Sequence, residues 1–297
     1  MEHKSIISTE QKQKIAEAVR QGRTNYSKDV KYAVSLGISA SQYSRAFNKG
    51  EMNKVLSDAN WLSIARRLGV NLGNRRSWVT ANTEVYEYIT TQLEICQERG
   101  VSYMLCDLSD IGKTYAARMY ARSNKNVVYV DCSQFKSKQR LIRAIAKEFG
   151  VGHTGRYVDV YEDLLFYIKI LDNPMIIMDE LGDLNNDALL ECKALWNGVE
   201  NCAFYVMGAD GLEARMRRGI AHEKVGYVEL FSRFGKKYGK VIPVDSADKR
   251  RMLDKTAMAI IKANSAKDAD HKKILNGAMG EDGLPSLRRI ENELSKL

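Results

Sequence analysis

The sequence predicts an α/β protein in which a parallel sheet flanked by helices follows a small all-α domain. From residue 83 onward, short apolar runs alternate with amphipathic stretches of helical length, which is typical of a parallel sheet covered by helices. Residues 1–76 show helical periodicity instead. They also carry 14 Lys and Arg against 6 Asp and Glu, whereas residues 77–297 carry 32 against 31. A small basic module on a nearly neutral body favours nucleic acid as its partner.

The first 70 residues are expected to form a helix-turn-helix DNA-binding domain. Apolar residues recur at helical spacing over 9–21 and 27–36, and Gly37 suits the left-handed end of the second of these helices. Ser39 and Gln42 form a capping box that begins the next helix. Two helices joined by a tight glycine turn on a basic domain favour DNA binding over a helical protein-interaction domain. The candidate DNA contacts on the outward face of the second helix are Gln42 and Arg45.

Residues 71–77 are polar and are predicted to link this domain to the rest of the chain. No apolar run reaches the ~18 residues of a membrane span, and no apolar stretch follows a basic N-terminus, so we expect a cytoplasmic protein without membrane contact. The five cysteines lack CxxC spacing, which favours free buried thiols.

A motif with phosphate-binding chemistry follows the linker. The apolar run at 101–107 is typical of a buried strand, and DLSDIGKT (107–114) leads into a strong helix former. Amides of such a loop cradle phosphates, Lys113 reaches the β and γ oxygens, and the Thr114 hydroxyl binds Mg²⁺. We therefore expect ATP and Mg²⁺ as cofactors. The predicted nucleotide-binding residues are Asp107, Ser109, Asp110, Ile111, Gly112, Lys113, Thr114 and Tyr115.

Position 107 departs from the pattern G-x-x-x-x-G-K-[ST], because Asp107 stands where the first glycine is usual. Aspartate tolerates unusual backbone angles better than most residues. A carboxylate beside a triphosphate is unfavourable unless it points away. The sequence therefore leaves open how strongly the loop binds nucleotide.

A second motif lies at 173–184, where a buried strand ends in two acids. Asp179 is expected to hold Mg²⁺, and Glu180 is expected to activate the attacking water, with Lys113 as the phosphate-binding catalytic partner. Apolar runs at 126–133 and 202–210 supply two further strands. In a parallel sheet both motifs lie at the same edge, where the strands end.

These motifs, together with LFSRF (230–234) and GLPSLRRIENEL (283–294), resemble AAA+ ATPases. Behind a helix-turn-helix domain, the arrangement looks most like the MuB-type target-selection ATPases of DNA transposition, relatives of TnsC and IstB. The resemblance implies an α/β ATPase core at 78–245 and a helical lid at 246–297. It also implies two arginines that reach the γ-phosphate: Arg233, a catalytic residue acting on a neighbouring subunit's nucleotide, and Arg288 of the lid, or alternatively Arg289.

The resemblance further implies a slow ATPase that is stimulated by DNA and by oligomerisation. ATP would drive a homo-oligomer, a ring or a filament, onto double-stranded DNA, where it recruits or stimulates a transposase. Three residues match the region that contacts the DNA backbone: Lys136, Lys138 and Arg140. Two alternatives remain, a helicase loader of the DnaC type and a helix-turn-helix regulator with a degenerate ATPase domain.

Overall fold

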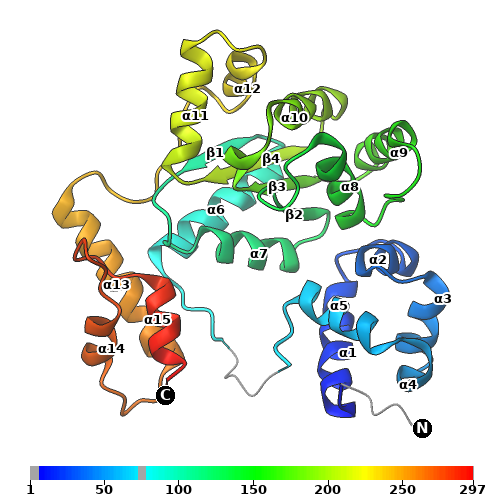
Figure 1. Cartoon of the computed structure of the whole chain (residues 1–297), viewed down its shortest axis with the longest axis horizontal. Helices are drawn as coiled ribbons and strands as arrows, with labels where there is room; N and C mark the ends of the chain where they lie inside the picture. The colour runs from blue at the N-terminus through cyan, green and yellow to red at the C-terminus, as the bar shows by residue number, and fades with distance from the viewer. Residues whose placement is uncertain (1–6, 73–77, 297) are drawn as a thin grey trace.

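A parallel four-stranded sheet forms the centre of the computed structural model, which describes residues 7–72 and 78–296 (Figure 1). Its strand order is β1-β4-β3-β2, and each neighbouring pair is parallel. The alternation of strands and helices therefore predicted the fold class correctly. The strands are β1 (Tyr103–Cys106), β2 (Val127–Asp131), β3 (Met175–Asp179) and β4 (Ala203–Gly208).

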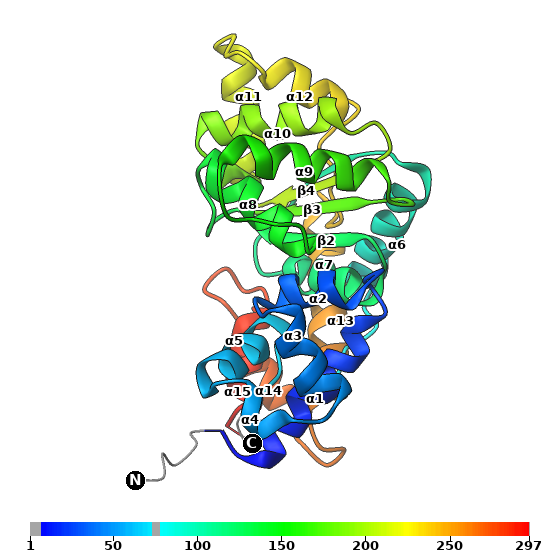
Figure 2. The ribbon, with the colours of Figure 1, turned by 90° about the vertical axis from the view of Figure 1, so that its right-hand side faces the viewer.

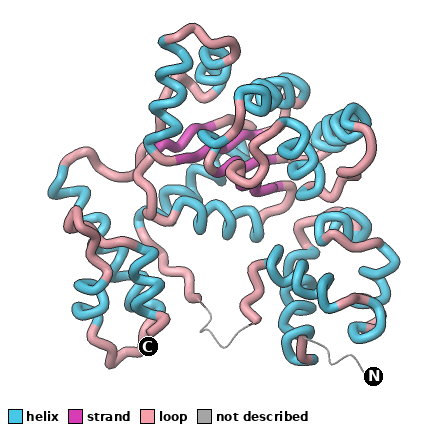
Figure 3. The backbone as a smooth tube through the Cα atoms, viewed as in Figure 1, coloured by secondary structure: helices cyan, strands magenta, loops and turns pink. Residues whose placement is uncertain are grey.

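Helices cover both faces of the sheet, as the secondary-structure colouring makes plain (Figure 3). One face is covered by α6 (Glu84–Arg99) and α7 (Lys113–Ser123), and the other by α8 (Lys138–Glu148), α9 (Tyr157–Lys169) and α10 (Asn186–Gly198). Past β4, α11 (Asp210–Ala221) and α12 (Tyr227–Arg233) project beyond the sheet (Figures 1 and 2). A short 3₁₀ helix, η2 (Leu181–Asp183), follows β3.

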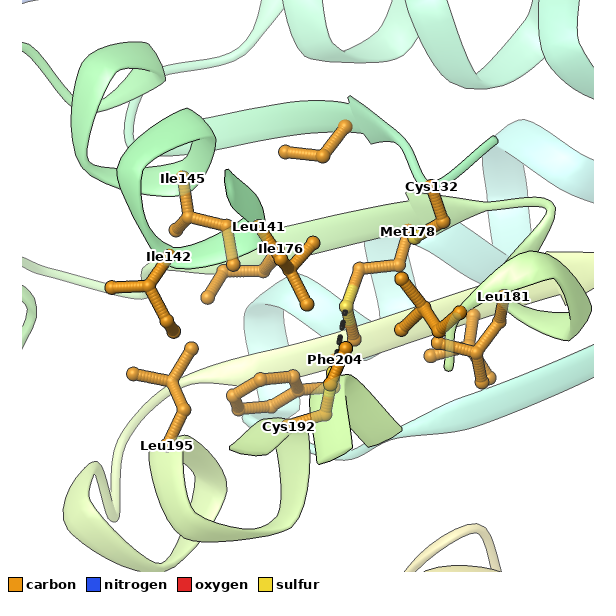
Figure 4. Packing of buried hydrophobic residues seen from close by; sticks show 14 of the residues in the cluster. Cys132, Leu141, Ile142, Ile145, Ile176, Met178, Leu181, Cys192, Leu195 and Phe204 are labelled. Carbon is orange, nitrogen blue, oxygen red and sulfur yellow. Dashed lines mark hydrogen bonds between the residues drawn. The ribbon is translucent and has the colours of Figure 1, made fainter. Parts of the chain in front are cut away.

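Apolar side chains of the strands face two separate hydrophobic layers. Ile176 and Met178 of β3 pack with α8 and α10, whereas Met175 and Ile177 pack with α6 and α7. Figure 4 shows the first layer, in which the Cys192 thiol donates to the Met178 sulfur at 3.8 Å. A strand buried on both faces reads as a continuous apolar run, which is why the strands were evident from the sequence. All five cysteines are buried and free, as predicted.

The N-terminal helices form a small domain with its own core. They are α1 (Thr9–Arg23), α2 (Asp29–Leu36), α3 (Ala40–Tyr43), the π-helical η1 (Ser44–Asn48), α4 (Met52–Val55) and α5 (Asp58–Leu68). The turn between α2 and α3 contains Gly37 at φ 79°, and Ser39 and Gln42 form the predicted capping box. Trp61 and Tyr32 lie at the centre of the core. Of the predicted linker at 71–77, residues 73–77 lie outside the described part of the chain.

The last three helices, α13 (Ser246–Asn264), α14 (His271–Gly277) and α15 (Leu287–Leu294), bury their own apolar cluster around Ile261 and Ile290. Both this C-terminal unit and the N-terminal domain lie on the α7 side of the sheet (Figures 1 and 2). Among the described residues, no helix combines the length and apolar character that a membrane crossing requires.

Candidate nucleotide site

The phosphate-loop motif lies between the end of β1 and the start of α7. The loop turns through two left-handed residues, Asp110 at φ 61° and Gly112 at φ 97°. Gly112 is the N-cap of α7, so the loop ends on the amides of an 11-residue helix. Glycine adopts this backbone without strain, and unpaired amides at a helix N-terminus attract phosphate. The local backbone is therefore suited to phosphate binding.

Lys113 is buried in this loop, with 6% of its surface exposed. Its Nζ donates to the Asp107 carbonyl at 2.8 Å and also to the Leu108 carbonyl. Burial lowers the pKa of the Lys113 ammonium, and the nearby carboxylates of Asp107 and Glu180 oppose that shift. The Lys113 ammonium donates to neutral carbonyl oxygens, so a phosphate oxygen would be a stronger partner.

Asp179 brings the two sequence motifs into direct contact. The Thr114 hydroxyl donates to Asp179 Oδ2 at 2.7 Å, although 65 residues separate them in the chain. The other carboxylate oxygen, Oδ1, accepts from the Glu180 amide at 3.0 Å. Mg²⁺ prefers oxygen ligands such as carboxylates and hydroxyls, and in nucleotide sites it is commonly shared with phosphate oxygens and waters. Thr114 and Asp179 therefore fit the metal role predicted for them.

Glu180 follows Asp179 in a left-handed conformation, with φ at 51°. This conformation is uncommon for a residue with a side chain, and it marks the turn from β3 into η2. The pKa of the Glu180 carboxyl is raised, by desolvation first and by the Asp179 charge second, although the side chain remains open to solvent. A carboxylate with a raised pKa beside a phosphate site suits a general base.

The Asp107 carboxylate is engaged with backbone and not with the loop's phosphate-binding face. Its Oδ2 accepts from the amides of Val241 and Ile242, the second at 2.9 Å, and its Oδ1 accepts from the Leu108 amide at 2.7 Å. Only 2% of Asp107 is exposed. The segment it holds leads directly into α13. The side chain thus fixes the connection to the C-terminal helices, and it is the loop carbonyl of Asp107 that meets Lys113.

The C-terminal helices reach the loop through Asp110. The Ser286 hydroxyl donates to Asp110 Oδ2 at 2.6 Å, and the Arg288 amide donates to Oδ1 at 3.2 Å. The Arg288 guanidinium lies 3.8 Å from the same carboxylate and is 84% exposed. Leu287 is also close to the loop, since its Cδ1 lies 3.7 Å from where a Cβ atom on Gly112 would be. Arg288, the predicted lid arginine, therefore lies in the first turn of α15, next to the phosphate loop, whereas Arg289 donates to the Met279 carbonyl at 3.0 Å.

The remaining loop residues have different environments. Ser109 is exposed, while Ile111 is 2% exposed and packs into the core beside α6. The Tyr115 hydroxyl pairs with the Thr80 hydroxyl at 2.6 Å, which joins α7 to the segment that precedes α6. Ile111 therefore anchors the loop through its side chain, and any contact that it makes with nucleotide would be through its backbone.

Arg233 lies at the end of α12, on the part of the fold that projects beyond the sheet (Figure 1). Its guanidinium lies 5.4 Å above the Trp196 ring and donates to the Asn197 side chain. No contact joins it to the described loop residues of its own chain. The role of Arg233 at the γ-phosphate of a neighbouring subunit, which the resemblance implies, stays a prediction.

The candidate DNA contacts of the N-terminal domain both have partners within that domain. Gln42 Oε1 accepts from the Ser39 amide at 2.9 Å as part of the capping box. Arg45 donates to Glu51 Oε2 from Nε at 2.8 Å and from Nη2 at 2.7 Å. Arg45 remains half exposed. Binding of a DNA phosphate by Arg45 would therefore compete with Glu51, while Gln42 serves the helix end.

The basic residues after β2 lie together on the surface. Lys136, Lys138 and Arg140 are all exposed, at the loop that leads into α8 and in the first turn of that helix. The Arg140 guanidinium lies 6.0 Å from the Phe135 ring centroid. These three side chains are accessible to a polyanion, as a DNA-backbone contact requires.

One residue of the site was not foreseen. Tyr129 of β2 donates its hydroxyl to Asp179 Oδ2 at 2.7 Å, on the same oxygen that Thr114 uses. Burial raises the Tyr129 pKa, and the Asp179 charge adds to the shift. A polar hydroxyl in an otherwise apolar strand, NVVYVD, was the one available signal. Tyr129 orients the carboxylate that would face the metal.

Comparisons with known proteins give a family match and two similar proteins. An AAA domain family matches residues 97–216, which include the phosphate loop and the Asp179-Glu180 strand end. The Mu-like prophage FluMu DNA transposition protein B of Haemophilus influenzae is 26% identical over 203 residues, covering 64% of this chain and 69% of that protein. NtrX from Brucella abortus, solved in complex with ATP, is 17% identical with a TM-score of 0.45; the match covers 86% of this chain and 59% of that one.

The family match spans the phosphate loop and the acidic strand end, but not the segments 230–234 and 283–294 that also contributed to the resemblance, and the transposition protein aligns with more than half of the chain. Residues 97–216 therefore match an AAA domain, and the chain is similar to a DNA transposition protein B, in agreement with the resemblance that its motifs predicted.

Proposed function

We propose that this chain is an ATP-dependent DNA-binding ATPase of DNA transposition, which assembles on double-stranded DNA and recruits or stimulates a transposase. The observation that carries the proposal is the contact between Thr114 and Asp179 at 2.7 Å, next to the buried Lys113. It unites a phosphate-binding loop with an acidic strand end. The relative named for DNA transposition supports the biological setting.

Nucleotide binding rests on the phosphate-binding groups of the loop and on the side chains that would hold the metal. The amides at the start of α7 and the Lys113 ammonium bind the triphosphate, which takes the place of the carbonyls that Lys113 now contacts. Thr114 and Asp179 hold Mg²⁺, and the Tyr129 hydroxyl keeps the carboxylate in orientation. When bound, the metal neutralises charge on the phosphate oxygens.

Hydrolysis then depends on two further side chains. Glu180 orients the attacking water and accepts its proton, which its raised pKa favours at neutral pH. Arg233 of a neighbouring copy stabilises the charge on the γ-phosphate. Because Arg233 lies away from its own loop, assembly and turnover are coupled. ATP favours the oligomer, and hydrolysis dismantles it.

DNA binding is assigned to the exposed cations Lys136, Lys138 and Arg140 and to the N-terminal domain, with Arg45 as its predicted contact. Such phosphate contacts are insensitive to sequence and weaken with salt. The alternative of a degenerate ATPase would draw its best support from Asp107, which stands where the first glycine of the loop is usual. That carboxylate is held by Val241 and Ile242, so it does not oppose a triphosphate in the loop.

Mixing two inactive variants tests the coupled assembly. We expect Arg233→Ala to bind ATP normally and to lose at least about 100-fold in turnover, since an arginine acting in trans contributes about 10³–10⁵. Glu180→Gln should also be inactive. A one-to-one mixture on duplex DNA should regain activity, because some interfaces combine an intact Glu180 with an intact Arg233. The measurement is phosphate release at low salt, with mass photometry to follow assembly with and without ATP.

Arg20→Ala, an exposed arginine of α1 paired with Glu17, is the matched control and should keep wild-type turnover. Melting temperatures of all variants confirm folding, because Arg233 also packs on Trp196. An assembly size that ignores ATP, or a mixture as inactive as its components, would contradict the proposal.

A further inference from the structure

A cavity of about 970 Å³ lies between the N-terminal domain and the α/β core. Its walls come from the α1–α2 region and α5 on one side and from α7, β2 and α8 on the other. We call it the interdomain cleft. Figure 2 shows the N-terminal helices directly beneath β2 and α7, the elements that form the opposite wall. This cavity is separate from the phosphate loop, none of whose residues from 107 to 114 line it.

The lining of the interdomain cleft is strongly basic. Its charged side chains are two acids, Asp131 and Glu148, and five cations: Arg66, Arg67, Arg118, Arg122 and Lys147. Arg67 pairs with Glu148, and Arg118 lies 4.0 Å from Asp131. Among the described residues, Arg66 and Arg122 have no carboxylate within ion-pair distance. The cleft therefore holds more positive charge than its own acids neutralise.

Some of these cations lie close to one another, Arg118 and Arg122 on α7 within one wall and Lys147 and Arg67 across the cleft. Burial lowers the pKa of the Arg122 guanidinium, and the neighbouring Arg118 lowers it further. Burial likewise lowers the pKa of Lys147, Arg67 adds to the shift, and Glu148 opposes it. Bringing like charges together is unfavourable unless an anion lies between them. This arrangement is expected where an anionic ligand completes the structure.

One of the lining residues carries a buried hydroxyl without a partner. Tyr32 of α2 is 2% exposed, lines the cleft, and its hydroxyl has no hydrogen-bond partner in the described structure. Buried hydroxyls are almost always paired. The guanidinium groups of Arg66 on α5 and Arg122 on α7 provide donors on both walls of the cleft, and the Tyr32 hydroxyl is an unused donor behind them.

We propose that the interdomain cleft binds phosphate groups through Arg66 and Arg122. Guanidinium forks match the geometry of phosphate oxygens, and a volume of about 970 Å³ admits several such groups. The phosphates come from one of two sources, the backbone of DNA or a free polyphosphate ligand. The first source deepens the proposed function, on which it rests, because it places DNA between the two domains.

The cleft is linked to the nucleotide site through the side chains of Arg118 and Tyr129. Tyr129 lines it, and the Arg118 guanidinium lies 5.0 Å above the Tyr129 ring. The Tyr129 hydroxyl in turn donates to Asp179. A phosphate that draws Arg118 toward the cleft acts two side chains away from the carboxylate that would face the metal.

The double variant R66A/R122A in the full-length chain tests the proposal. For the DNA source, fluorescence anisotropy with a labelled 30-base-pair duplex should show affinity at least about tenfold weaker at low salt. The slope of log Kd against log salt should fall by about 2, since each lost phosphate contact removes ~0.9. For the free source, calorimetry with inorganic triphosphate in a Lys113→Ala background, which silences the phosphate loop, should show binding that R66A/R122A removes.

The matched control is R156A/R251A, two exposed arginines that lie outside both the cleft and the N-terminal domain. It should leave both measurements unchanged. Loss of either ligand in R66A/R122A alone supports the cleft and identifies the source. Wild-type DNA and triphosphate binding that R66A/R122A leaves intact overturns the cleft while the proposed function stands. A wild-type chain that binds neither probe overturns the cleft, and its lack of DNA binding contradicts the proposed function as well.

Discussion

Replacing Lys113 with alanine is expected to weaken ATP binding by at least about 100-fold, which corresponds to ~2.7 kcal/mol. Lys113 is the buried cation of the loop, and its ammonium donates to main-chain carbonyls. A triphosphate replaces these carbonyls because a charged oxygen is a stronger acceptor than a neutral one. Without the ammonium, the α7 amides alone face the γ-phosphate. Isothermal titration calorimetry with ATP and Mg²⁺ measures the loss directly.

A matched control exists on the far side of the sheet. Lys169→Ala at the end of α9 removes an exposed lysine and should bind ATP as the wild type does. Thermal unfolding of K113A shows whether the loop still folds, because two hydrogen bonds to carbonyls are lost. ATP affinity of folded K113A within threefold of the wild type would refute the role of this lysine.

Replacing Asp107 with glycine, which restores the usual loop pattern, is expected to destabilise the protein instead of improving nucleotide binding. The Asp107 carboxylate accepts from three amides, of Leu108, Val241 and Ile242. A buried amide without a partner costs about 1–3 kcal/mol, so the loss should reach about 2–4 kcal/mol. In a chain of this size that lowers the melting temperature by roughly 5 °C or more.

Asp107→Asn separates the two effects of the substitution. Its amide oxygen retains one acceptor, so its melting temperature should lie between those of D107G and the wild type. Differential scanning fluorimetry gives the order of stability, and calorimetry with ATP gives the affinity. Tighter ATP binding by D107G at unchanged stability would show that Asp107 opposes the nucleotide after all.

The sequence was sufficient to predict the centre of the site because its geometry is local to the strand ends. A lysine after β1 and an acid at the end of β3 must lie near one edge of a parallel sheet, and Thr114 and Asp179 do meet there. The apolar runs of the strands were equally direct, since burial on both faces removes the polar alternation.

The parts that could not be predicted depend on contacts between distant segments. The orientation of Asp107 is set by amides 134 and 135 residues away, and that of Asp110 by Ser286, 176 residues away. Periodicity carries no information about such contacts. The capping role of Gln42 was foreseen, but the partner of Arg45, which is Glu51, was not.

A crystal structure of the chain with Mn²⁺ and a non-hydrolysable ATP analogue tests the central claim most directly, because Mn²⁺ can be located by its anomalous signal. We predict an Mn²⁺ peak beside the Thr114 hydroxyl and Asp179, with the triphosphate along the loop. Lys113 Nζ should have turned from the Asp107 carbonyl to the oxygens of the triphosphate. A triphosphate and Mn²⁺ found elsewhere, with Lys113 still on its carbonyls, would contradict the account.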